Sequence, residues 1–506
     1  MDATSFTSTE LGAAAAIDAL RSAGFEIGAP EAVVRTLLDT FDGRLHAAGL
    51  RLELRAAATT ELVLRDGGVA GAHVAVGGAP RVAADLPAGP LRARLARVLD
   101  VRALLAVATV RSLARTAVLR DRTGKGRVSV VVTERLTVEG ADPLASTWAA
   151  DVETLAGYPK DAQRARDLLS SIGLAGGDGD VVDALGIDLS GFKGSPTVPL
   201  APGTEALDAF RKVLANLVAA VDANRPGAID DIDPEFLHDL RVAVRRTRSV
   251  LTEGKGVLPA DVRKKFRTGF GWLGGATGPA RDLDVYVIEW GDYVAPLGPE
   301  GSAALSPVLD DIVARRAAEH ATLAKTLQSA QYRKLLTDWH RWLDKEQVDR
   351  SAKDASRSAA AVAAARIARA QAQVLDRGRT IGPETEAEVL HELRKDAKTL
   401  RYLLECLGGL YAPAPRKAFV QRLKALQDNL GEHQDTEVHV AQLRDMSRKL
   451  HASAGPDALV AIGRLTEHLE GRRRAAREEF AERFAAYDTK PTARSLDTLL
   501  RSAGQT

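Results

Sequence analysis

The sequence contains a single cysteine, Cys406, among its 506 residues. One cysteine cannot form a disulfide within the chain, and this composition fits a reducing cytoplasm. No run of about 18 apolar residues is present, so we expect no segment that spans a membrane. The first residues carry no basic region ahead of an apolar stretch, so we expect no secretory signal. Together these absences predict a cytoplasmic protein without a membrane partner.

Aromatic residues and net charge are also scarce. Aromatics make up 5% of the residues, and 69 basic against 67 acidic residues leave a net charge of +2. Proteins that hold single-stranded nucleic acid stack its bases on aromatic side chains, so nucleic acid is not an expected partner. A global attraction to polyanions is excluded as well, and any anion site must come from local clusters of charge. The apolar share of 45% supports sizeable cores, and the length predicts two or three domains.

One helical signature is written twice. It reads LHDLRVAVRRTRSVL from Leu237 to Leu251 and LHELRKDAKTLRYLL from Leu390 to Leu404. In each copy a histidine is followed by basic residues at +3, +7 and +10. At roughly 100° per residue these positions fall within about 80° of one helix face, so each helix presents a stripe of positive charge. The stripes are His238, Arg241, Arg245 and Arg248 in the first copy, and His391, Arg394, Lys398 and Arg401 in the second.

A second pattern repeats at the same offset of 153 residues. Gly278, Asp282, Asp284 and Val285 correspond to Gly431, Asp435, Glu437 and Val438. We interpret residues from about 205 to 506 as an internal duplication with quasi-twofold symmetry. If both copies pack their apolar faces inward, the two basic stripes should face each other across a shared groove. For the acidic residues we expect a structural role, in which carboxylates cap helices or hold arginine side chains in position.

The two halves of the chain differ in their secondary-structure signals. Short strand-like runs occur between about residues 33 and 138, with helices expected at Pro90–Leu99 and Ala162–Ile172. Helix signals dominate from Thr204 onward, with long helices expected at Ser351–Leu375 and Leu459–Phe484. We therefore predict an α+β domain over residues 1–175, a Gly- and Pro-rich linker over 176–203, and an all-α domain of two pseudo-symmetric bundles over 204–506.

The second half resembles the CHAD family, the conserved histidine α-helical domain. The resemblance rests on both basic stripes together with the segments LGGATGPARDLDVY at 273–286 and LQDNLGEHQDTEVH at 426–439. It implies a helical domain that binds inorganic polyphosphate along a basic channel between its two halves, with association to polyphosphate granules in some bacteria. The residues to which we assign polyphosphate binding are His238, Arg241, Arg245, Arg246, Arg248, His391, Arg394, Lys395, Lys398, Arg401, Lys424 and His433.

Other roles for these residues stay open at this point. Exposed arginines on a helix often form solvated surface or ion pairs with carboxylates, and the two histidines could cap helices or lie in a core. Metal binding by His238 or His391 is not expected, because each shares a helix face with three cations that would repel a metal ion. We expect no cofactor. The oligomeric state is not readable from the sequence.

The first half is similar to the CYTH family of triphosphate tunnel proteins. The similarity rests on DTFDGRLHAAGLRLEL at Asp39–Leu54 and on RSLARTAVLRDRTGKGRVSVVVTERLTV at Arg111–Val138, which contains Glu134. The family opens with an ExExK strand whose glutamates hold a divalent metal. Here the N-terminus reads MDATSFTSTELGAAA, with Glu10 alone, and Glu53 stands where the family has a basic residue.

These departures indicate a partial or degenerate β-barrel without efficient triphosphatase activity, because the metal lacks its main ligands. The expectation is therefore a polyphosphate-binding protein that is not an enzyme. The alternative is a metal-dependent triphosphatase or polyphosphatase that uses a makeshift set of carboxylates on Glu53, Glu134, Asp151 and Glu153. Residual anion binding in this half would use Arg55, Arg111, Arg115 and Lys125.

Overall fold

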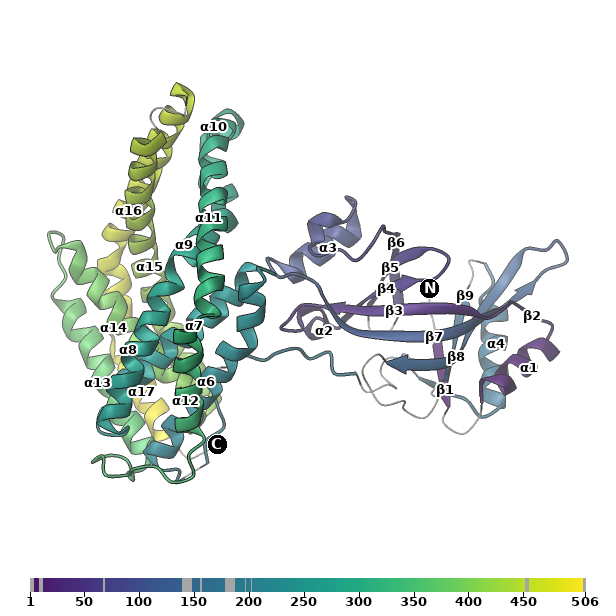
Figure 1. The fold of residues 1–506 in the computed structure, drawn as a ribbon, viewed down its shortest axis with the longest axis horizontal. Coiled ribbons are helices and arrows are strands. Elements are labelled where there is room, and N and C mark those ends of the chain that lie inside the picture. The colour runs from purple at the N-terminus through teal and green to yellow at the C-terminus, as the bar shows by residue number, and fades with distance from the viewer. Residues whose placement is uncertain are drawn as a thin grey trace. The chain divides into compact units, whose positions relative to one another are not determined.

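The computed structural model describes residues 4–8, 12–66, 69–138, 148–154, 157–177, 187–195, 197–201, 203–450 and 455–503. The chain divides into two compact units, Met1–Lys193 and Gly194–Thr506 (Figure 1). Parts of the segment expected to form a linker, residues 178–186, 196 and 202, lie outside the described residues, as does Glu10.

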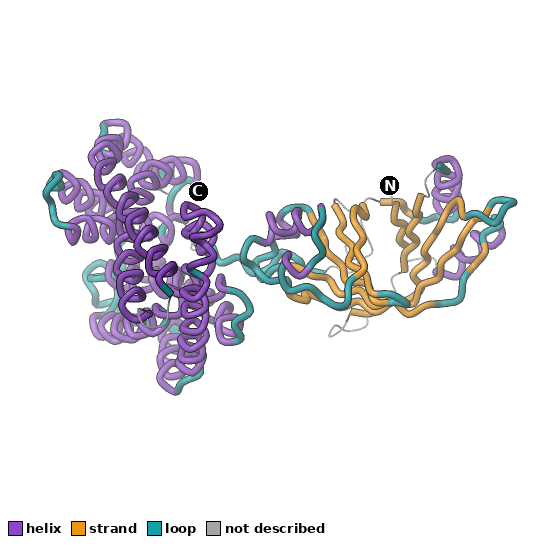
Figure 2. Tube along the Cα trace, turned by 90° about the horizontal axis from the view of Figure 1, so that it is seen from above, coloured by secondary structure: helices purple, strands orange, loops and turns teal. Residues whose placement is uncertain are grey.

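The N-terminal unit is built on one antiparallel sheet that curves into an open half-barrel (Figure 2). The strands follow the order β10-β1-β9-β8-β7-β3-β4-β5-β6, and β2 pairs with β7. Their bounds are β1 Thr4–Ser8, β2 Glu26–Ile27, β3 Glu31–Asp39, β4 Leu50–Ala56, β5 Thr60–Asp66, β6 Val69–Ala75, β7 Leu105–Arg120, β8 Gly126–Val138, β9 Trp148–Thr154 and β10 Ala175–Gly177. This half-barrel is compatible with a CYTH-like fold.

Helices α1 Ala13–Ser22, α2 Arg44–Ala47, α3 Pro90–Leu99 and α4 Pro159–Ser171 accompany the sheet. Helix α3 has the predicted bounds. It begins with Pro90 in its first turn, where no backbone donor is needed, and its leucines recur every fourth residue. Those leucines pack on Leu52, Leu62 and Leu64 of the sheet. A second core lies between the sheet and helices α1 and α4, around Phe6 and Trp148.

A strand also forms at the N-terminus, ahead of the strand-like runs that the sequence shows from about residue 33. Strand β1 lies between β9 and β10, and its Phe6 is 2% exposed within the second core. The segment TSFTS holds one large apolar residue, too little to stand out as a strand in the sequence. Pairing with two neighbours provides the hydrogen bonds that fix it.

The C-terminal unit is all-helical throughout its described residues, apart from isolated bridges. The helices are α6 Ala206–Ile229, α7 Pro234–Glu253, α8 Ala260–Ala276, α9 Gly278–Val294, α10 Gly298–Ala304, α11 Ser306–Leu327, α12 Ala330–Leu343, α13 Ala359–Arg379, α14 Ala387–Cys406, α15 Pro413–Leu450, α16 Pro456–Tyr487 and α17 Lys490–Arg501. Long helices α15 and α16 pack side by side (Figure 1). No described helix combines the length and the apolar character that crossing a membrane requires.

Helix α13 begins at Ala359, later than the predicted Ser351. The backbone before it bonds to distant segments instead: Asp354 donates to Gly256, while Ala355 and Arg357 accept from Leu207 and Ala206. These tertiary hydrogen bonds replace the helical ones that an alanine-rich sequence favours. Helix α16 extends slightly beyond the predicted Leu459–Phe484 at both ends.

The helix bounds repeat at the predicted offset. Helices α7 and α14 each contain 20 residues, and both ends of α14 lie 153 residues after those of α7. Helices α6 and α13 start at Ala206 and Ala359, the same distance apart. The repeat is not perfect, since α15 runs on where α8 and α9 are separated at Thr277.

Candidate functional site

Helices α7 and α14 carry the two basic stripes, and they pack against each other. Helix α7 starts where the Asp233 carboxylate accepts hydrogen bonds from the backbone amides of Glu235, at 2.9 Å, and Phe236, at 3.3 Å. The apolar face that adjoins each stripe is buried, as the sequence predicts. Its residues are Leu237, Leu240, Val244 and Leu251 in α7, and Leu390, Leu393, Ala397 and Leu404 in α14. Burial of these faces leaves the charged faces available to a common surface.

A groove of about 880 Å³ lies between α7, α8 and α14, and residues of both stripes line it. Arg245 and Arg248 of the first stripe and Lys398 of the second thus line one groove, with Lys395 beside them. The cations of the lining are Arg245, Arg248, Arg263, Lys264, Arg267, Lys395 and Lys398, and the lining contains no acidic residue. We call this surface the basic groove.

The sequence interpretation missed the contribution of α8. Arg263, Lys264 and Arg267 follow the spacing of one helix face, beside the face that carries the buried Phe266 and Phe270. The run VRKKFR was the available signal. Without a histidine in register, this run does not stand out from ordinary solvated surface.

Lys398 experiences the strongest electrostatic perturbation in the groove. Burial, followed by repulsion from Arg245 and Arg394, lowers the pKa of its ammonium group to about 7. Arg401 adds to the repulsion, and the Asp435 carboxylate offsets part of it. The cations therefore repel one another, and an anion in the groove would relieve that repulsion.

Arg241 and Arg394 are not among the lining residues of the groove. Arg241 donates to the Thr277 hydroxyl at 3.1 Å, and burial lowers the pKa of its guanidinium. Arg394 donates to the Asp435 carboxylate at 2.9 Å. These equivalent arginines therefore tie α7 to the α8–α9 junction and α14 to α15.

The structural role predicted for the acidic residues is confirmed at two positions. Asp284 is 3% exposed and accepts from Arg316 Nε at 2.6 Å, while Asp435 holds Arg394. For Asp282, burial raises the carboxyl pKa despite the nearby Arg241. Glu437 accepts from the Gln434 side chain at 3.3 Å.

Arg246 and Arg401 also lie outside the lining, because one carboxylate engages both. Glu405 accepts from Arg246 Nη2 at 2.6 Å and from Arg401 Nε at 2.7 Å. This pairing links α7 to the end of α14.

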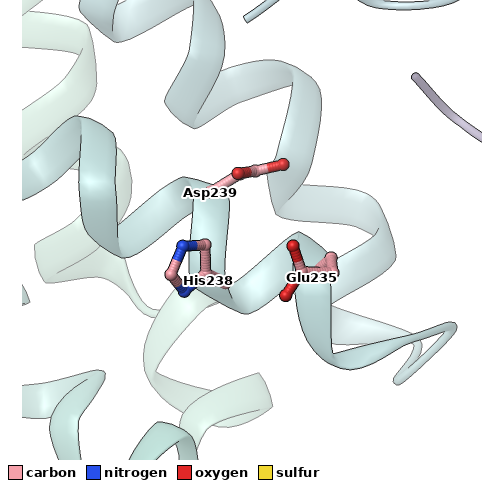
Figure 3. A group of neighbouring side chains, drawn as sticks. All are labelled: Glu235, His238 and Asp239. Atoms are coloured by element: carbon pink, nitrogen blue, oxygen red, sulfur yellow. The ribbon is translucent and has the colours of Figure 1, made fainter. Parts of the chain in front are cut away.

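The histidines of the stripes face other polar groups. His391 Nδ1 lies 2.6 Å from the Gln434 side-chain oxygen. His238 shares one surface of α7 with Glu235 and Asp239, and one ligand atom from each lies within 4.8 Å of the others (Figure 3). Arg281 approaches Glu235 to 3.9 Å and would compete with a cation there. The absence of metal binding stays a prediction.

Lys424 and His433, both assigned from the sequence, are not brought to the basic groove. Lys424 is exposed and lies 3.9 Å from Asp428. His433 is 4% exposed, and burial lowers the pKa of its imidazole. Both belong to helix α15, which is 38 residues long and can pack against different helices along its length. A sequence motif within α15 therefore does not reveal which neighbour each side chain contacts.

Two of the four candidate carboxylates of the N-terminal unit, those of Glu53 and Glu134, are paired with arginines. Glu53 is 1% exposed and lies within 3.0–3.6 Å of arginine Nε atoms from Arg51, Arg55 and Arg65. Glu134 pairs with Arg115. The Glu153 side chain lies outside the described residues, and Asp151 lies on β9. Three guanidinium groups around one carboxylate would repel a metal ion rather than help to hold it.

Comparison with known proteins bears on the helical unit. Residues 212–444 match the family model of the CHAD domain. This region of the chain is a CHAD domain. No curated protein matches the chain.

Three solved structures are similar to parts of the chain. The crystal structure of the CHAD domain from the plant Ricinus communis is 24% identical, covers 62% of this chain and 98% of its own, and has a TM-score of 0.46. PptA from Streptomyces chartreusis is 17% identical over 56% of this chain and 100% of its own, with a TM-score of 0.46. A protein from Pyrococcus horikoshii OT3 is 12% identical over 36% of this chain and 98% of its own, with a TM-score of 0.25.

Proposed function

We propose that the helical unit binds inorganic polyphosphate in the basic groove. The observation that carries this proposal is a lining of seven cations from three helices without a carboxylate among them. Each internal phosphate carries about one negative charge, so a linear polyanion needs a row of donors rather than a single pocket. Arginine forks supply paired hydrogen bonds, and lysines supply compact charge.

The state of Lys398 supports an anionic ligand. The pKa of Lys398 lies near 7 because burial, and then repulsion by neighbouring guanidinium groups, disfavours its charged ammonium form. Phosphate oxygens in the groove would reverse that effect and favour the charged ammonium. The Lys398 ammonium therefore adds to the attraction that the arginines of the groove exert on anions.

The composition of the lining argues against nucleic acid. Tyr402 is the one aromatic residue among the groove-lining residues. Non-specific binders of single strands stack successive bases on aromatic platforms, and one tyrosine does not provide a ladder. The CHAD assignment favours the same ligand, since this family is associated with polyphosphate. By extension we propose a cytoplasmic location on polyphosphate granules.

We further propose that the chain is not an enzyme. Tunnel-type hydrolysis needs carboxylates that hold a metal against the phosphates. The arginines around Glu53 and the Arg115 side chain at Glu134 occupy two of the four candidate carboxylates.

The deciding experiment titrates the purified full chain with long-chain polyphosphate, triphosphate, ATP and single-stranded DNA over a range of salt. We expect long-chain polyphosphate to bind most tightly, with log K falling linearly against log salt as counterions are released. Equal affinity for single-stranded DNA, or no binding of polyphosphate at low salt, would overturn the proposal.

A further inference from the structure

The two repeats place different residues at the two ends of the paired helices. Arg248 and Arg401 are equivalent, and so are Thr252 and Glu405, each pair being 153 residues apart. Arg248 and Thr252 line the basic groove. Their equivalents Arg401 and Glu405 pair with each other at 2.7 Å. One end of the helix pair is therefore basic, and the other carries its own counterion.

Glu405 neutralises two arginines at once. Its side chain is 16% exposed and accepts from Arg246 Nη2 at 2.6 Å and Nε at 3.1 Å, while its other oxygen accepts from Arg401. An approaching phosphate must displace this carboxylate, which already makes short, charge-assisted hydrogen bonds. Thr252 offers no such competitor on the groove side.

A backbone segment adds cover on the Glu405 side. The Thr197 hydroxyl donates to the Glu405 backbone carbonyl at 2.9 Å and accepts from Arg416 at 2.6 Å. Arg416 is the equivalent of Arg263, which lines the groove. The Val198 carbonyl packs directly against Gly409, where a Cβ would lie 1.8 Å away. Arg416, the cation that could line an equivalent groove on this side, is therefore held by Thr197.

We propose that Glu405 is a specificity-determining residue that confines polyphosphate to the α8 side of the α7–α14 pair. By pairing with Arg246 and Arg401, Glu405 makes two cations unavailable to the ligand. The protein therefore contacts fewer consecutive phosphates of a bound polyphosphate. This inference rests on the proposed function of the basic groove. It makes the site one-sided although the fold is duplicated.

The test replaces Glu405 by the isosteric glutamine and measures long-chain polyphosphate binding by the full chain. Glu405→Gln should tighten binding by roughly fivefold or more. The slope of log K against log salt should become steeper by about one to two, because one or two more counterions are released on binding. The matched control is Glu470→Gln. Glu470 also pairs with two arginines, Arg444 and Arg473, and is 15% exposed, so its variant has the same change of net charge. The control should match the unmodified chain.

One comparison of variants tests the inference even if Glu405→Gln fails to fold. Arg248→Gln should weaken binding severalfold more than Arg401→Gln does, although the two arginines are equivalent in the repeat. In the Glu405→Gln background, Arg401→Gln should remove most of the gain, which a double-mutant cycle measures.

The outcomes separate the two proposals. If the unmodified chain does not bind polyphosphate, the proposed function itself is wrong. If it binds but Glu405→Gln behaves like Glu470→Gln, or Arg401→Gln weakens binding as much as Arg248→Gln, the role of Glu405 is refuted and the groove remains.

Discussion

The rings of Tyr286 and His439 pack against each other with their centroids 4.7 Å apart, and the two residues occupy equivalent positions 153 residues apart. Contact between two equivalent residues places both of them close to the pseudo-twofold axis that relates the two repeats. Arg245 and Lys398 are another equivalent pair, and their charges interact in the basic groove. The same duplication therefore brings together the centres of both basic stripes.

Charge reversal in the groove should abolish tight polyphosphate binding. Arg245→Glu with Arg248→Glu should weaken affinity by roughly 100-fold or more, since hydrogen bonds to charged groups contribute about 1.5–3 kcal/mol each. Fluorescence titration and circular dichroism would measure binding and folding. The control is Arg21→Glu with Arg164→Glu, which makes the same charge change at side chains 59% and 81% exposed in the N-terminal unit. An equal loss in both double variants would show that only global charge matters.

Polyphosphate binding should weaken as the pH rises above about 7. The pKa of Lys398 lies near 7 in the protein alone, because of burial and repulsion from Arg245, Arg394 and Arg401, partly offset by Asp435. Binding favours its protonated form, so the chain takes up a proton on binding above pH 7, and affinity falls by at most about tenfold per pH unit. Isothermal titration from pH 7.5 to 9.5, above the ordinary range of imidazoles, would show this proton uptake.

The control for that pH dependence is Lys398→Arg. Arginine keeps its charge throughout this range, so the variant should bind with an affinity that barely changes with pH. A pH dependence that persists unchanged in Lys398→Arg would rule out Lys398 as its source.

Removing Arg316 should destabilise the helical unit. Its guanidinium bonds bidentately to Asp231 at 2.6 and 2.7 Å and to the buried Asp284 at 2.6 Å. Arg316→Met strands the Asp284 carboxylate, at a cost of about 2–3 kcal/mol in unfolding free energy. This figure allows for side chains 21% exposed at Arg316 and 35% exposed at Asp231.

The pH dependence of that loss has a defined sign. Burial raises the pKa of Asp284, so its ionised form costs stability at neutral pH and protonation relieves the cost. The deficit of Arg316→Met should therefore shrink as the pH falls from 7 to 5. Urea unfolding at both pH values would measure it, with the double variant Arg316→Met and Asp284→Asn as the control, which should recover stability at pH 7.

The chain should not release phosphate from triphosphate with Mg²⁺ or Mn²⁺. Arginines surround Glu53 and pair with Glu134, so two of the four candidate carboxylates already hold cations in place of a metal. A phosphate-release assay should give the same background for the unmodified chain and for Glu134→Ala. Metal-dependent turnover that Glu134→Ala abolishes would restore the triphosphatase alternative.

Local periodicity in the sequence determined several features directly. The helix expected at Pro90–Leu99 forms with those bounds as α3, and the 153-residue offset predicted the matching ends of α7 and α14. A helix fixes the angular position of each side chain about its own axis, so the separation of buried leucines from basic stripes was readable from either copy.

Only the tertiary structure decided which cations share a surface. Arg246 meets Glu405 across 159 residues of sequence, α8 supplies a wall that carries no motif, and His433 turns into the interior of its unit. Strand β1 likewise depends on partners more than 100 residues away. The physical reason is that a helical or strand pattern specifies the face of one element, whereas ion pairs, burial and pKa depend on the neighbours that packing brings to that face.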